Sequence, residues 1–151
     1  MAGHLRGRVI DSIDPAVSEF IRVHRVARLA TVDDAGSPHV IPVCYAFDGE
    51  RLYTALDLKP KRVEGRMLKR VRNILENPKV ALVIDDYSER WGALAYVLSH
   101  GVACIVDEGE EQRSGERLLR SKYPQYRELL ETGATIISIT PEEIISWGRV
   151  R

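Results

Sequence analysis

The stretch ARLATVDDAGSPHVIPVCYAFDGERLYTA, residues 27–55, decides the fold because it holds three strand-like runs joined by short turns. The runs 27–32, 39–47 and 51–55 are rich in apolar and β-branched side chains, and turn-forming residues separate them. Turns this short join antiparallel neighbours, since parallel strands need a longer crossover. Pro42 lies within the middle run and has no N–H to give to a sheet, so we expect an edge, a bulge or an opening toward a ligand there.

Helices and further strands are expected along the rest of the chain. Asp14 followed by Pro15 is a typical helix start, and Asn77-Pro78 ends a second, amphipathic pattern. The patterns predict helices over about 14–25, 62–76 and, with a break at Pro124, 108–130, and strands over 79–85, 93–106, 135–139 and 144–150, the last two around a turn at 140–143. Antiparallel strands with helices inserted between them predict an α+β fold, mainly β, in which about six strands form a barrel with helices packed outside.

Length and charge indicate one domain and exclude some classes of partner. The 151 residues fit a single domain, 1–151, and 22 Lys and Arg balance 22 Asp and Glu, which argues against nucleic acid or a membrane surface as the partner. No apolar run is long enough to span a bilayer, and the N-terminal residues lack the apolar region of a secretion signal, so we expect a cytoplasmic protein. Cys44 and Cys104 form no Cys-x-x-Cys motif, and buried thiols are expected at both positions.

Sequence motifs of several enzyme classes are absent. The four histidines show no metal-ligand spacing, so no metal site is predicted. The chain has no Gly-x-Ser-x-Gly elbow, no Gly-x-Gly-x-x-Gly fingerprint and no P-loop, which leaves hydrolase chemistry, Rossmann-type dinucleotide binding and P-loop phosphoryl transfer without support. No residue is identified as catalytic.

Residues 59–72 are the strongest local anomaly, because seven cations face a single acid, Glu64. In a helix, Arg62, Arg66, Lys69 and Asn73 share one face beside the apolar stripe. A cationic face beside the core suits a phosphate-bearing ligand, while a solvated helix surface is the plain alternative. Nucleic acid is a poor candidate for these charges, because the net charge is zero and no aromatic side chains are interleaved with them.

Taken together, these segments resemble the pyridoxamine 5'-phosphate oxidase-like FMN-binding split-barrel family, and in particular its branch of F420 (deazaflavin)-dependent oxidoreductases. The resemblance runs from residues 27–55 through LKPK (58–61), LKRVRNILENPKVALVIDDY (68–87) and WGALAYVLSHGVACIV (91–106). It implies a split antiparallel barrel of Greek-key type and a homodimer whose sites use both chains. It also implies an oxidoreductase that transfers a hydride between a reduced cofactor and a small organic substrate.

The same resemblance implies where the cofactor and the substrate lie. Coenzyme F420 is the expected cofactor and FMN the alternative, with a non-catalytic protein that binds a cofactor or a haem-like ligand as a third possibility. The cofactor ring is expected against the backbone atoms of Ile41, Pro42 and Val43, with Thr54 and Ala55 at its side and Trp147 close by. Its phosphate or tail is expected against Lys59, Lys61, Lys69, Arg70 and Asn73. Tyr87 and Trp91, in the loop between two strands, are expected to face the substrate.

Overall fold

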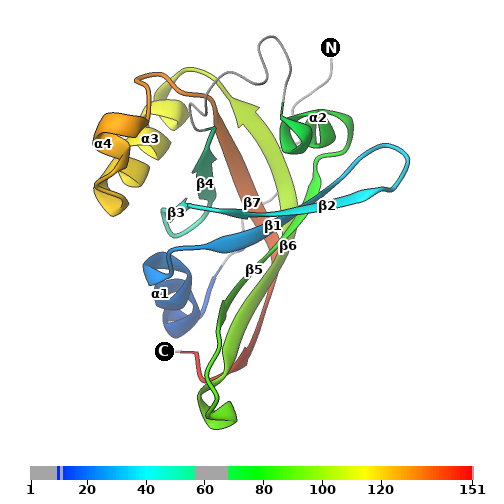
Figure 1. The fold of residues 1–151 in the computed structure, drawn as a ribbon, viewed down its shortest axis with the longest axis vertical. Helices are drawn as coiled ribbons and strands as arrows, with labels where there is room; N and C mark the ends of the chain where they lie inside the picture. Colours follow the sequence, from blue (N-terminus) through cyan, green and yellow to red (C-terminus); the bar gives the residue numbers. More distant parts are fainter. Residues whose placement is uncertain (1–9, 11, 57–67, 151) are drawn as a thin grey trace.

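The computed structural model describes residues 10, 12–56 and 68–150, and within them it shows one curled antiparallel sheet with helices around it (Figure 1). The helices are α1 (Pro15–Val23), α2 (Lys69–Glu76), the short 3-10 helix η1 (Trp91–Ala93), α3 (Glu110–Lys122) and α4 (Tyr126–Leu129). The strands are β1 (Ala27–Val32), β2 (Pro38–Val43), β3 (Ala46–Phe47), β4 (Leu52–Ala55), β5 (Lys79–Asp86), β6 (Ala95–Val106) and β7 (Ile136–Gly148). The predicted α+β, mainly antiparallel architecture is confirmed.

The sheet forms a barrel that is split between its two edge strands. Its order is β2-β1-β5-β6-β7-β4-β3, and every strand pairing is antiparallel. The edges β2 and β3 do not pair with each other, although only Cys44 and Tyr45 separate them along the chain. Tyr45 fills this corner, because its buried hydroxyl donates to the Ile21 carbonyl and its N–H donates to the Tyr123 hydroxyl. Pro42 lies on the edge strand β2, as its missing N–H predicts.

Two strand predictions were wrong at their boundaries. The run 39–47 is interrupted at the corner and forms two strands, β2 and β3. The complete sheet has seven strands, close to the predicted number of about six. Residues 135–139 and 144–150 belong to the single long strand β7, and no turn separates them. The Thr-Pro-Glu-Glu sequence looked like a turn, yet it passes through a β-bulge, with a register shift between His100 and Gly101. A bulge tolerates Pro141, because a ladder hydrogen bond is missing there.

Gly101 allows the two strands to approach at this bulge. A Cβ at position 101 would lie 3.0 Å from the Pro141 Cα and closer still to the Thr140 carbonyl oxygen. Only a residue without a side chain fits here without moving the backbone of β7. The bend of the long β6–β7 ribbon therefore depends on glycine at this position.

The barrel interior is filled from the strands and from two helices. Asp14 caps α1 by accepting from the Ala16 N–H at 2.8 Å, and Phe20 and Ile21 of α1 are buried in the main core. Val71 and Ile74 of α2 enter the same core from the other end. A second cluster lies under α3 and α4, where Leu119, Tyr123 and Tyr126 pack with Tyr53 and Ile136.

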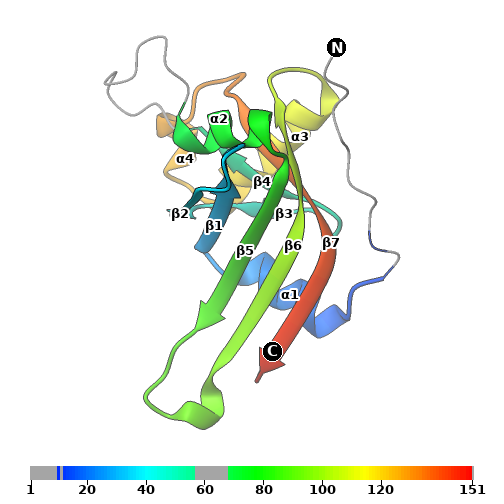
Figure 2. The same ribbon diagram turned by 90° about the vertical axis from the view of Figure 1, so that its right-hand side faces the viewer.

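One face of the sheet carries no helix in the described part of the chain. Along β5, Val80, Leu82 and Ile84 are buried inside the barrel. Val83 and Asp85, at the alternate positions, therefore point outward. Figure 2 shows β5, β6 and β7 facing the viewer with no helix in front of them. This outer face holds the candidate site.

Candidate functional site

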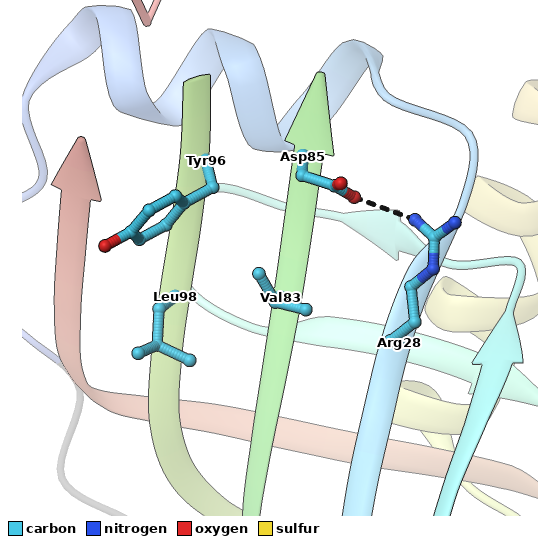
Figure 3. Close-up of a pocket in the computed structure, with 5 residues that line it drawn as sticks. All are labelled: Arg28, Val83, Asp85, Tyr96 and Leu98. Atoms are coloured by element: carbon cyan, nitrogen blue, oxygen red, sulfur yellow. Dashed lines mark hydrogen bonds and ion pairs between the residues drawn. The ribbon is translucent and has the colours of Figure 1, made fainter. Parts of the chain in front are cut away.

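A shallow cavity of about 550 Å³ lies on the outer face of the sheet (Figure 3). We call it the groove, and it is lined by Arg28 of β1, Val83 and Asp85 of β5, and Tyr96 and Leu98 of β6. The Arg28 Nη1 donates to the Asp85 Oδ1 at 2.8 Å, and both side chains are about half exposed. The groove therefore combines an accessible ion pair, a phenol and an apolar floor.

Strand register explains why these five side chains meet. Arg28 pairs with Val83, Val83 pairs with Leu98, and Asp85 pairs with Tyr96. Directly paired residues of neighbouring antiparallel strands project from the same face of a sheet. Because the residues that alternate with Val83 and Asp85 along β5 are buried, all five side chains must face outward.

Register also brings two of the predicted cofactor residues beside the groove. Pro42 pairs with Arg28 across the β1–β2 ladder, and Trp147 pairs with Tyr96 across the β6–β7 ladder. The rings of Tyr96 and Trp147 are stacked, with centroids 5.7 Å apart and an interplanar angle of 19°. Pro42 and Trp147 thus border the groove on opposite sides.

Gly148 holds Trp147 in this position. It has a φ of 79°, which an L side chain rarely adopts, and a Cβ there would lie 3.0 Å from the Ala95 Cα and nearer to the Leu94 carbonyl. The close backbone approach keeps the end of β7 against the start of β6. The backbone next to Trp147 is therefore held close to the start of β6.

The side chains of the other residues predicted to contact the ring lie outside the groove. Ile41 pairs with Leu29, which is fully buried, so Ile41 faces the barrel interior. Val43 has the same orientation along β2 and packs against the main core. Thr54 and Ala55 are buried on β4, where they pair with β7, and neither lines the groove. Their contact with a cofactor remains a prediction.

Of the basic segment 59–72 the structure describes residues 68–72, which form the start of α2. The helix expected over 62–76 therefore has a different start, because Leu68 is extended and caps a helix that begins at Lys69. The Lys69 Nζ lies 3.5 Å from the Asp33 Oδ2, which ties the start of α2 to the turn between β1 and β2. The pKa of Asp33 is lowered because the Ser37 N–H donates to its carboxylate, with a further contribution from the Lys69 ammonium. Arg70 is half-buried, while Lys59 and Lys61 lie outside the described residues.

Asn73 occupies a different environment from the one expected for a phosphate ligand. It is completely buried, and its Nδ2 donates to the Thr31 Oγ1 at 3.0 Å. Its Oδ1 is buried without a hydrogen-bond partner. In this structure the side chain joins α2 to β1 and does not reach the surface, so a cofactor contact at Asn73 would require rearrangement.

Tyr87 and Trp91 lie in the connection between β5 and β6, and both are strongly exposed. This connection forms the tip at the lower end of the sheet in Figure 2, beyond Asp85 and Tyr96. Neither side chain lines the groove. Their role toward a substrate remains a prediction.

Sequence reasoning missed Arg28, Asp85 and Tyr96. The available signal was alternation, since a charged residue within an otherwise apolar strand marks the face that the core does not use. Alternation does not reveal which strands become neighbours, so the Arg28–Asp85 pair, 57 positions apart, needed the tertiary structure.

Two negative findings hold for the residues that the structure describes. They contain no cluster of three or more His, Cys, Asp or Glu side chains suited to a metal ion. None of their helices has both the length and the apolar character needed to cross a bilayer.

Comparison with known proteins agrees with this architecture. The family model described as "Pyridoxamine 5'-phosphate oxidase" matches residues 13–148. A 5a,11a-dehydrotetracycline/5a,11a-dehydrooxytetracycline reductase of Streptomyces rimosus is 29% identical over 130 residues, which cover 85% of this chain and 78% of that protein.

Solved structures show the same fold at low sequence identity. A conserved hypothetical protein of Mycobacterium tuberculosis is 23% identical with a TM-score of 0.70, covering 95% of this chain and 88% of its own. The haem storage protein HutZ of Vibrio cholerae is 18% identical with a TM-score of 0.67, covering 87% and 92%. At these identities the likeness concerns the fold alone.

Proposed function

Because the chain belongs to the pyridoxamine 5'-phosphate oxidase family, we propose that it is an F420-dependent oxidoreductase acting on a small organic substrate. Membership in this flavin-related family and the relative named as a reductase support oxidoreductase activity. The observation that carries the finer proposal is the groove, with Pro42 and Trp147 at its borders.

The groove fits a flat tricyclic ring. Val83 and Leu98 offer an apolar floor, and the stacked pair of Tyr96 and Trp147 adds a broad aromatic surface at one side. Pro42, on an edge strand, leaves the backbone open toward a ligand on the other side. Lys69, whose side chain remains half exposed, would hold phosphate with other members of the basic segment.

When bound, a reduced deazaflavin supplies a hydride to an electron-poor C=C, C=N or quinone-like group. The protein's own residues bind and orient the reactants. Arg28 donates one N–H to Asp85 and has further N–H donors that can orient a substrate oxygen. The Tyr96 hydroxyl is a hydrogen-bond donor and acceptor within the same groove.

We also propose that a second copy of the chain covers the outer face. Three large apolar side chains on this face are exposed: Val40 at 63%, Ile145 at 43% and Trp147 at 51%. An apolar surface of this kind is typical of an interface, and a homodimer would enclose the groove and exclude water from it.

Titration of the purified protein with coenzyme F420, FMN and haemin tests this proposal. We expect tight F420 binding, followed by cofactor fluorescence, and oxidation of the reduced cofactor by an electron-poor acceptor. Tight FMN binding without F420 binding would favour the FMN-dependent alternative. Haemin binding without turnover under any reductant would favour the non-catalytic alternative, and binding of none of the three would contradict all of them.

A further inference from the structure

A second cavity, of about 370 Å³, shares no lining residue with the groove. It is bounded by the end of α1, the strand β3 and the end of α3. Figure 1 places these elements on the left of the molecule, opposite the uncovered strands that Figure 2 shows from the right. We call this cavity the cationic pocket, because Arg22, Arg25 and Lys122 line it.

Two of the three cations, Arg25 and Lys122, have no carboxylate partner among the described residues. The Lys122 Nζ donates to the His24 carbonyl at 2.5 Å and lies 4.0 Å from the centre of the Tyr45 ring. Arg25 donates to the Lys122 carbonyl and lies over the Tyr123 ring. Arg22 alone of the three is paired, with Glu19 of its own helix.

The helix ends explain part of this arrangement but leave its charge uncompensated. Arg25 and Lys122 bond to carbonyls at the ends of α3 and α1, where cations are favourable. Each carbonyl satisfies one donor, whereas an ammonium has three and a guanidinium five. Burial, followed by repulsion from Arg25, lowers the pKa of Lys122 to about 8, as expected for a cation that lacks a counter-charge.

The rest of the lining limits the chemistry of a ligand. Phe47 and Leu118 supply apolar surface, and Ser121 supplies a hydroxyl beside Lys122. A volume of about 370 Å³ is within the range of small-molecule sites. An anionic head with a small organic body would match both the cations and the apolar wall.

We propose that the cationic pocket binds a phosphate-bearing small molecule, with the phosphate at Arg22, Arg25 and Lys122 and the organic body against Phe47 and Leu118. A dianionic phosphate monoester suits a pocket lined by three cations better than a single carboxylate does. This site is separate from the groove, so it is independent of the proposed cofactor.

Calorimetric titration with phenyl phosphate and with inorganic phosphate, in chloride buffer at pH 7, tests the proposal. We expect phenyl phosphate to bind more tightly than inorganic phosphate, because only the former contacts the apolar wall. Arg25→Gln and Arg22→Gln should each weaken phenyl phosphate about tenfold, the loss of one charge-assisted contact. Arg22 is exposed, and among the described residues its ion pair is with Glu19 alone, so its variant should fold normally, which circular dichroism checks.

Two controls separate this site from other basic surfaces. Arg117→Gln alters an exposed arginine of α3 outside the pocket and should leave the affinity unchanged. Lys69→Gln reports binding at α2. Loss of affinity in Lys69→Gln alone would assign the phosphate to the expected cofactor site and overturn the proposal. Equal affinity in Arg22→Gln, Arg25→Gln and the wild type, or no binding at all, would also overturn it.

Discussion

Substitution of Gly101 by alanine tests whether the bulge of β6 and β7 is as tight as the structure shows. The added Cβ would lie 3.0 Å from two backbone carbons, Pro141 Cα and Thr140 C, and closer still to the Thr140 oxygen. Favourable carbon contacts lie near 3.5–4.0 Å, so β7 must move away by roughly half an ångström or more. The obstacle is backbone, which cannot rotate aside as a flexible side chain would.

The expected loss of stability follows from two effects. Overpacking costs about 1–3 kcal/mol, and displacement of β7 weakens neighbouring ladder hydrogen bonds worth about 1 kcal/mol each. We therefore expect Gly101→Ala to lower the free energy of unfolding by about 3 kcal/mol, a large share of the roughly 5–15 kcal/mol typical of a domain. Urea denaturation followed by circular dichroism measures this change.

Gly92→Ala is the matched control for this substitution. A Cβ at Gly92 meets no atom within 4 Å, and its φ is not positive, so its unfolding free energy should stay within about 0.5 kcal/mol of the wild type. A Gly101→Ala protein as stable as the Gly92→Ala protein would refute the close approach of β6 and β7 and, with it, the account of the bend.

Four further outcomes are expected. Trp147→Ala should weaken deazaflavin affinity by about 1–2 kcal/mol through loss of ring contact. Leu129→Ala, which changes an exposed apolar residue of α4, should not. Equal affinities of the two variants in fluorescence titration would remove Trp147 from the site. Lys69→Gln should weaken cofactor binding by about 1–3 kcal/mol and reduce its salt dependence, while the free energy of unfolding changes by only some tenths of a kcal/mol. An unaltered affinity at two salt concentrations would leave α2 as a solvated surface. Lys122 has a pKa of about 8 in the folded protein, below its ordinary value of 10.5, so between these values the unfolded chain binds more protons than the folded one. The free energy of unfolding should therefore rise with pH, by about 1 kcal/mol from pH 8 to 10 after allowing for solvent screening. Lys122→Met should abolish this rise in urea midpoints, and an equal rise in both proteins would contradict the assignment. Ile145→Glu should turn the proposed homodimer into a monomer in light scattering, and a wild-type protein that is monomeric while binding cofactor at full affinity would exclude the dimer.

Local sequence determined most of the secondary structure. The cap at Asp14, the turns at 33–37 and 48–50 and the break at Pro124 each rest on interactions between residues close in the chain. These interactions are the same whether or not the rest of the molecule has folded. For that reason the start of α1, the strand 27–32 and the antiparallel class could be predicted, and the family resemblance agreed with them.

The sequence could not distinguish a turn from a bulge at residues 140–143. Thr-Pro-Glu-Glu has the residue types of a turn, and the deciding fact is the presence of β6 alongside, with a glycine opposite Pro141. The same limit applies to Asn73. Its position on a helical face beside the apolar stripe was predicted, but its burial depends on packing against β1, where it bonds to Thr31. Packing against a distant strand reassigned a surface residue to the interior.

Both cavities were decided by tertiary structure alone. The groove needs the register that places Asp85 beside Arg28, and the cationic pocket needs α1 and α3 to meet so that Arg25 reaches the end of Lys122's helix, 97 positions away. Local patterns state which residues alternate toward a core, because side-chain direction follows backbone geometry. They do not indicate which distant strands and helices become neighbours, because that depends on how the whole chain buries its apolar surface. A shift of one residue in register would turn every groove side chain into the barrel.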